Sequence, residues 1–199
     1  MRLLAQALAL AYAAGISPFA TVAVLGIAHR MEWLGELPGA LDLVGSRWVI
    51  GIAGALYALE FLATMVPGVA SVWETLQTFI RPPLAALLAG AAVWDTDGLA
   101  PIAVPLGGML GLTTHGTKLG MRYAIDASPE PVTNGAANIL ELGAVSALVL
   151  AVWQHPYTAL GVALAVLVLL LLLVRAIWVG IARTVRSWRS GGAQTSAVE

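Results

Sequence analysis

The stretch Gly111-Leu-Thr-Thr-His-Gly-Thr-Lys-Leu-Gly-Met-Arg122 places titratable side chains in an apolar setting. It closes an apolar segment, and its His115, Lys118 and Arg122 stand at helical positions i, i+3 and i+7. Because these positions share one face of an α-helix, the three side chains form a basic column. The glycines around this column leave room for a second backbone or a ligand to approach closely. The stretch therefore predicts a polar site that is held by an otherwise apolar helical scaffold.

The composition predicts an integral membrane protein. Of the 199 residues, 59% are hydrophobic and 11% are charged, and the mean hydropathy is +0.87. A soluble domain carries about 25% charged residues, so this chain is far too apolar for that class. The net charge of −1 gives no reason to expect a nucleic-acid partner.

The sequence offers no support for catalysis or for a cofactor. It has no cysteine, which excludes disulfides, thiolate metal ligands and a cysteine nucleophile. Its three histidines lie far apart along the chain, which is a poor basis for a metal site. No nucleophile motif, phosphate-binding loop or dinucleotide-binding glycine pattern is present. We therefore expect a protein that is not an enzyme and holds neither a cofactor nor a metal.

The apolar segments predict an all-α bundle of about six membrane spans. About 20 residues cross a hydrocarbon core of roughly 30 Å. Apolar segments near this length cover residues 3–28, 48–66, 69–93, 99–121, 134–154 and 157–181. Pro18 interrupts the first segment, which is either one kinked span or a broken pair of half-helices. Residues 1–182 form the predicted membrane domain, and the basic and then polar tail 183–199 is predicted to be cytoplasmic and disordered.

Six spans place both termini on one side of the membrane. Lys118, Arg122 and Arg183 then lie on that side, whereas the acidic turn at residues 95–97 lies on the other. Because basic residues favour the cytoplasmic side, the sequence predicts a protein of a bacterial inner membrane with both termini in the cytoplasm.

Two short similarities indicate an internal repeat. Residues 14–21 (AGISPFAT) resemble residues 110–117 (LGLTTHGT), and residues 54–59 (GALYAL) match residues 143–148 (GAVSAL). The two halves, residues 1–95 and 99–182, contain three predicted spans each, so they would be inverted relative to one another, as in many transporters. Chance similarity between helices that are rich in small apolar residues is the alternative.

Ionisable and amide side chains within the apolar segments are the candidate binding groups. An acid at the centre of a membrane helix costs about 2.5–3.5 kcal/mol, so Glu60 is expected to face protein or water. Glu74, Thr78 and Arg81 follow at i, i+4 and i+7, either as a polar lane or as an internal Glu–Arg tie. The candidate ion- or substrate-binding residues are Glu60, Arg81, His115, Lys118, Arg122, Asn134, Asn138 and Glu141.

A purely structural reading accompanies each of these candidates. Glu60 and the two asparagines can serve only to link helices across the bundle. Lys118 and Arg122 can serve only to mark the cytoplasmic boundary, where they would touch lipid headgroups.

Several of these residues lie in a pattern that resembles a known family. The pattern comprises Glu60, Pro67, Trp73-Glu74-Thr75, Arg81-Pro82, the basic column, residues 128–134 (SPEPVTN) and Glu141. Over residues 9–174 it resembles the small bacterial membrane proteins grouped as domain of unknown function 4126. In that family an Asp-Lys pair precedes the proline turn and an Asp follows the second Glu; this chain has Thr64-Met65 and Leu142 there. The resemblance implies a membrane location.

Three functions are compatible with these observations. The first is a transporter or channel for a small ion or solute, with Glu60 and Glu141 as charge carriers and His115, Lys118, Arg122 and Arg81 as counter-charges. The second is a binder or translocator of a lipid phosphate headgroup, because the basic column has glycine clearance around it. The third is a non-transporting subunit of a larger membrane complex, which the missing Asp-Lys pair favours. The expected partners are the bilayer and either a second copy or a membrane complex.

Overall fold

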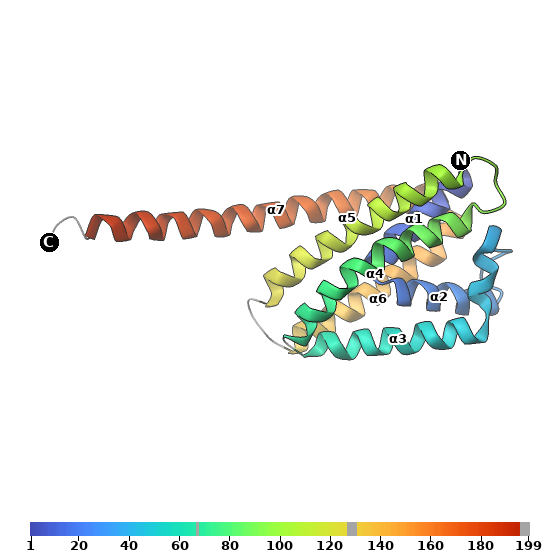
Figure 1. The fold of residues 1–199 in the computed structure, drawn as a ribbon, viewed down its shortest axis with the longest axis horizontal. Helices are drawn as coiled ribbons and strands as arrows, with labels where there is room; N and C mark the ends of the chain where they lie inside the picture. The colour runs from blue at the N-terminus through green and yellow to red at the C-terminus, as the bar shows by residue number, and fades with distance from the viewer. Residues whose placement is uncertain (67, 127–130, 196–199) are drawn as a thin grey trace.

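The fold is known from a computed structural model, which describes the backbone of residues 1–66, 68–126 and 131–195 and the side chains of residues 1–66, 68–122 and 134–183. These residues form α-helices joined by short turns and one 3-10 helix (Figure 1). The helices are α1 (Arg2–Ile16), α2 (Pro18–Arg30), η1 (Gly39–Gly45), α3 (Arg47–Met65), α4 (Val69–Ala92), α5 (Ala100–Asp126), α6 (Pro131–Gln154) and α7 (Pro156–Thr195). The predicted all-α class is confirmed.

Helices α1 and α2 form a hairpin that enters the bundle and leaves it at the same end. Ser17 has an extended backbone (φ −154°, ψ 105°), which ends α1, and its hydroxyl accepts a hydrogen bond from the Ala20 amide at the start of α2. At the outer end, the Arg2 guanidinium donates to the Trp153 carbonyl (2.9 Å), and Arg2 shares a cavity with Trp33 and Glu36. Of the two alternatives that the sequence allowed for the first segment, a kinked span or a broken pair of helices, the structure has the broken pair.

Neither helix of this hairpin is long enough to span a membrane. They have 15 and 13 residues, and at about 1.5 Å per residue each falls short of a hydrocarbon core of roughly 30 Å. Helices α3 to α7 instead run the length of the bundle in alternating directions (Figure 1). The described chain thus has five full-length helices and one hairpin in place of the six predicted spans.

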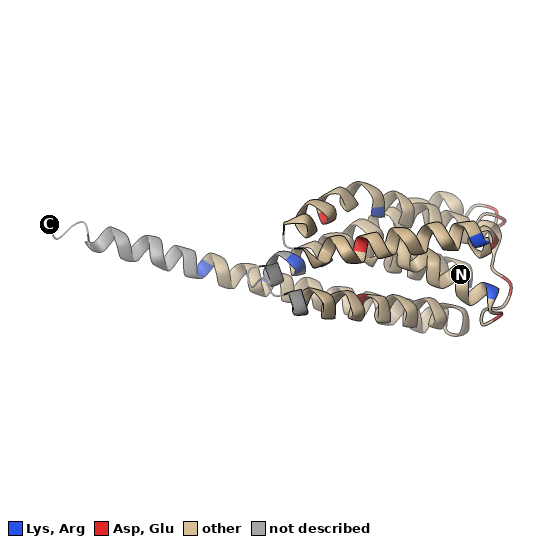
Figure 2. Cartoon of the chain, turned by 90° about the horizontal axis from the view of Figure 1, so that it is seen from below, with Lys and Arg blue, Asp and Glu red and all other residues tan. Residues whose placement is uncertain are grey.

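Helix α7 leaves the bundle at the end opposite the start of α1 (Figures 1 and 2). The hairpin returns the chain to the end where it started, so α1 begins at one end of the bundle and α7 leaves at the other. That both termini lie in the cytoplasm stays a prediction. Helix α7 also continues past the predicted span to Thr195. Residues 183–195 are helical where disorder was predicted, since no proline interrupts the extension of α7; residues 196–199 lie outside the described part.

Helix α1 occupies the centre of the bundle. Every residue from Ala5 to Gly15 except the half-buried Leu8 is buried, and α1 packs against α4, α5, α6 and α7. Its alanines suit this position, because a helix that is apolar on all sides is stable when protein surrounds it. The first apolar segment is thus the core of the bundle and not one of its outer helices.

The outer helices expose their apolar side chains. Three helical stretches, Arg47–Met65, Asn134–Gln154 and Pro156–Arg183, are long and apolar enough to cross a membrane. Only 11–22% of their most apolar windows is buried within the protein. Apolar surface on this scale suits contact with lipid and would be unfavourable in water. The predicted inverted repeat stays a prediction, because residues 14–21 contain the Ser17 break whereas residues 110–117 lie within the continuous α5.

Candidate functional site

Three carboxylates and three cations, taken from four helices, meet inside the bundle. They are Glu60 of α3, Glu74 and Arg81 of α4, Lys118 and Arg122 of α5, and Glu141 of α6, and we call them the buried charge network. Five of the six side chains are at most 8% exposed, and Glu141 is 24% exposed. Separate apolar segments therefore bring their polar residues together, as the cost of leaving a charge unpaired in an apolar interior requires.

Arg81 of α4 forms one ion pair with an acid of α3 and another with an acid near the start of α4. Its Nη2 lies 2.6 Å from Glu60 Oε1, and its Nη1 lies 3.0 Å from Glu74 Oε2. The second contact is the Glu–Arg tie that the i, i+7 spacing allowed. Ser17 completes the arrangement, because its hydroxyl donates to Glu60 Oε2 (2.9 Å). The break in the hairpin is thereby joined to the acid of α3.

Lys118 connects all three acids. Its Nζ lies 2.7 Å from Glu141 Oε2, 3.3 Å from Glu74 Oε1 and 3.8 Å from Glu60 Oε1. It also donates to the carbonyl oxygen of Ile16 (3.0 Å), the last residue of α1. The final carbonyls of a helix have no partner within that helix and carry the negative end of its dipole, so they attract a cation. The break after Ile16 therefore supplies a further acceptor to the network.

His115 acts as a neutral acceptor in this geometry. Its Nδ1 lies 2.8 Å from Arg81 Nη1, and its Nε2 lies 2.9 Å from Thr78 Oγ1. Arginine can only donate, so Nδ1 must carry a lone pair and the ring proton must sit on Nε2, where it is directed at Thr78. With this tautomer the ring orients Arg81 and adds no charge, whereas the prediction made His115 a counter-charge; that role stays a prediction.

Arg122 is held by amide side chains of α6. Its Nη2 donates to Asn138 Oδ1 and its Nη1 to Asn134 Oδ1, and Nη2 also lies 3.8 Å from Glu141 Oε1. Asn138 in turn donates to Thr64 Oγ1 (2.8 Å) on α3. The asparagines thus link α6 to α3 and α5, in agreement with their reading as helix links, and they also fix the position of a cation.

A cavity gives access to one side of the network. It has a volume of about 320 Å³ and is lined by Lys118, Arg122 and Glu141 together with apolar residues of α1, α5, α6 and α7. Glu141 is the most exposed acid of the network, and it is the acid that lines this cavity. An ion or a proton entering from this side would therefore reach Glu141 before Glu60 or Glu74.

All eight predicted candidates lie in one connected set of contacts: Glu60, Arg81, His115, Lys118, Arg122, Asn134, Asn138 and Glu141. The predicted site residues do not include five contributors, namely Ser17, Glu74, Thr64, Thr78 and the Ile16 carbonyl. They also do not include Gln77, a buried side chain whose amide has no partner among the described residues. Two signals pointed to Glu74, namely its i, i+7 spacing to Arg81 and its place in the Trp73-Glu74-Thr75 part of the family pattern.

Over the described residues, no group of three or more histidine, aspartate and glutamate side chains is placed to hold a metal ion. The carboxylates and cations of the network form ion pairs that can exchange partners. Each carboxylate has more than one cation within reach, and Lys118 can exchange one acid for another by a small movement.

A comparison with protein families gives one match. The family model described as Domain of unknown function (DUF4126) matches residues 4–176, a range that includes every residue of the buried charge network. No curated protein and no solved structure matches the chain.

Proposed function

The chain belongs to the family described as Domain of unknown function (DUF4126), and we propose that it transports a small ion or solute across a bacterial inner membrane with the movement of protons. The buried charge network is the proposed pathway for those protons. Support comes from the placement of ionisable groups, since charged residues inside membrane proteins usually mark proton or ion pathways.

The proposed membrane arrangement has five spanning helices, α3 to α7, and the α1–α2 hairpin as a re-entrant pair. Arg175 lies at the middle of α7 and Arg183 in its second half, and the sequence adds Arg186 and Arg189 beyond them. Basic residues favour the cytoplasm, so this end of α7 is cytoplasmic and the N-terminal end of α1 faces the opposite side. Irregular backbone within a membrane requires surrounding protein, and the buried Ser17 break meets that condition.

The observation that carries the proposal is the position of Lys118. It contacts one acid from each of α3, α4 and α6, and it also contacts the carbonyl at the tip of the hairpin. A proton that reaches Glu141 through the cavity weakens the shortest of these contacts. Lys118 is then free to move toward Glu60 and Glu74, which links protonation at the accessible acid to the packing of α3, α4 and the hairpin.

The hairpin supplies an element that such a change can act upon. In many transporters, broken helices end at the binding site and rearrange around it. Here the tip is attached to the network by two hydrogen bonds, from Ser17 to Glu60 and from Lys118 to Ile16. A shift of Lys118 away from Ile16 would leave only the Ser17 contact to hold the tip.

The test is proton flux into proteoliposomes that contain a pH-sensitive dye, driven by a potassium diffusion potential. The wild-type protein is expected to acidify the vesicles, and Glu141→Gln and Glu60→Gln are expected to reduce the rate to that of protein-free vesicles. Glu36→Gln is the matched control, because Glu36 is an exposed residue far from the network. Undiminished flux in both network variants would remove these acids from the mechanism. No flux from wild-type protein, with stable co-purification of a membrane complex, would favour the structural-subunit alternative.

A further inference from the structure

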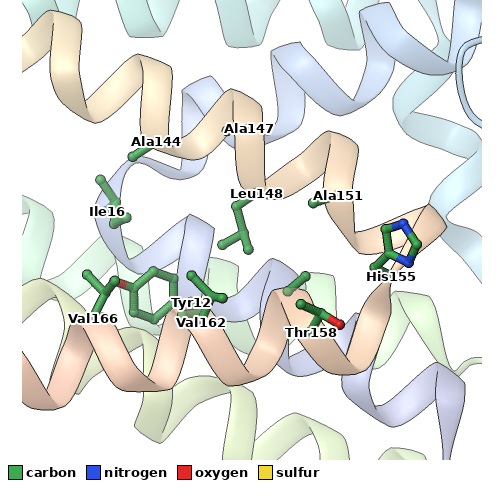
Figure 3. A pocket seen from close by; sticks show the side chains of 12 residues that line it. Tyr12, Ile16, Ala144, Ala147, Leu148, Ala151, His155, Thr158, Val162 and Val166 are labelled. Carbon is green, nitrogen blue, oxygen red and sulfur yellow. The ribbon is translucent and has the colours of Figure 1, made fainter.

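An apolar groove lies between α6 and α7 and has α1 as its floor (Figure 3). It has a volume of about 390 Å³. The side of the groove on α6 carries small residues, Ala144, Ala147 and Ala151, and the facing side on α7 carries Val162 and Val166. The alanines leave a trough that larger residues would fill, and its lining suits a hydrocarbon chain.

This groove continues into the cavity beside the buried charge network. The two cavities share Tyr12, Ile16, Ala144 and Val166, so they adjoin at that end of the groove. The second cavity then ends at the charged side chains of Lys118, Arg122 and Glu141. The combined space is apolar along most of its length and charged at one end, which matches the shape of an amphiphile.

The charged end has unused hydrogen-bonding groups. Arg122 Nε and Thr114 Oγ1 have no hydrogen-bond partner among the described residues, although their side chains are almost fully buried. Both residues line the cavity. Buried donors without partners are unfavourable, and both atoms are enclosed by protein beside the cavity, so a ligand oxygen could pair with them after a small movement of either side chain. The six charges of the network cancel, but the ones that line this cavity are two cations and one carboxylate, so an anionic group that enters here meets more positive than negative side chains.

The depth of the charged end fits a headgroup. Glu60 precedes the end of α3 at Met65 by five residues, and Glu74 follows the start of α4 at Val69 by five. At about 1.5 Å per residue, the network lies within roughly 8 Å of the end of the bundle at which α7 leaves it. The groove runs from there toward His155, at the opposite end of α6 (Figure 3). A lipid with its polar group at the network would therefore extend its chain into the bilayer.

We propose that this groove binds one anionic phospholipid from the surrounding leaflet, with its phosphodiester at Arg122, Lys118 and Thr114 and one acyl chain along α6 and α7. A phosphodiester carries one negative charge, and its oxygens can accept from several donors at once, including a guanidinium. A phospholipid can reach the groove from the bilayer, because the outer faces of α6 and α7 are apolar and suit contact with lipid. This site does not depend on the proposed transport of ions.

The proposal is tested by native mass spectrometry of the purified full chain with equimolar phosphatidylglycerol, phosphatidylethanolamine and oleate. The wild-type protein is expected to retain phosphatidylglycerol preferentially. Arg122→Gln is expected to lower this preference by about tenfold, the effect of losing one charge-assisted hydrogen bond. Ala147→Phe fills the groove and is expected to reduce binding of both phospholipids. Ile139→Phe is the matched control, since Ile139 is exposed on α6 and does not line either cavity.

Each other outcome overturns the proposal. Equal retention of the two phospholipids would show that the charged end does not select a headgroup. Preferential retention of oleate would assign the site to a free fatty acid. Equal losses in Ala147→Phe and Ile139→Phe would place the lipid outside the groove. Helical circular dichroism and monodisperse elution establish that each variant is folded, and wild-type binding in Ala147→Phe would itself contradict the proposal.

Discussion

At the scale of single residues, the clustering of the polar side chains could be predicted from the sequence, because an apolar segment offers few positions in which a polar group is stable. A charge or an amide in an apolar interior requires a partner, and the partners available are the other polar residues of the same bundle. Glu60, Arg81, Lys118 and Glu141 met for this reason. The Ile16 carbonyl was not predictable, because a backbone acceptor becomes available only where a helix ends, and the position of that end was open.

Lys118→Met is expected to destabilise the protein by about 3–5 kcal/mol, since it leaves three buried or partly buried acids against two arginines. The double variant Lys118→Met with Glu141→Gln removes one acid as well and is expected to recover most of that loss. Thermal unfolding in detergent, followed by intrinsic tryptophan fluorescence, measures both variants. Proton flux is expected to be absent from each. A double variant no more stable than Lys118→Met would show that Glu141 is not the main partner of Lys118.

At the scale of helices, the limits of α3, α4 and α6 lay within a few residues of the predicted spans, because prolines and polar turns mark them. The break at Ser17 was harder to predict. A proline inside an apolar segment is compatible with a kink and with the first turn of a new helix. Burial of α1 on all sides, which depends on distant helices, decides between the two.

The close contact between α4 and α5 yields a prediction on two glycines of α5. A Cβ atom on Gly111 would lie 2.4 Å from Ala85 Cβ, so Gly111→Ala is expected to cost about 1–3 kcal/mol in stability. A Cβ atom on Gly116 would meet nothing within 4 Å, so Gly116→Ala is expected to be neutral or to gain up to about 1 kcal/mol from its helix propensity. Unfolding midpoints of the two variants measure the difference. Equal midpoints would contradict the close packing of α5 on α4.

At the scale of the whole molecule, hydropathy predicted the apolar helices that suit a membrane, but it did not predict that the first apolar segment forms the α1–α2 hairpin. A hydropathy pattern counts apolar segments, and residues 3–28 are long enough to count as one span. A hydropathy pattern carries no information on whether an apolar segment crosses the membrane or folds back to the side from which it entered. If the hairpin is a re-entrant pair, as proposed, the number of crossings becomes odd and the N-terminus moves to the side opposite the end of α7.

The absence of cysteine allows a direct test of this path. Arg2→Cys and Glu36→Cys are expected to react alike with a membrane-impermeant maleimide on intact spheroplasts, because α1 and α2 open at the same end. Arg183→Cys is expected to react only after lysis. Six full spans would instead place Arg2 with Arg183, so protection of Arg2→Cys alongside Arg183→Cys would disprove the re-entrant pair.

The matching numbers of cations and carboxylates in the described network also bear on how the protein responds to voltage. An elementary charge that crosses a potential of 100 mV changes in energy by about 2.3 kcal/mol. Three arginine or lysine charges and three glutamate charges cancel, so the electric field exerts no net force on the cluster when it moves as a unit. For such a movement, any dependence of turnover on membrane potential would report the charge of the cargo and of the protons that move with it.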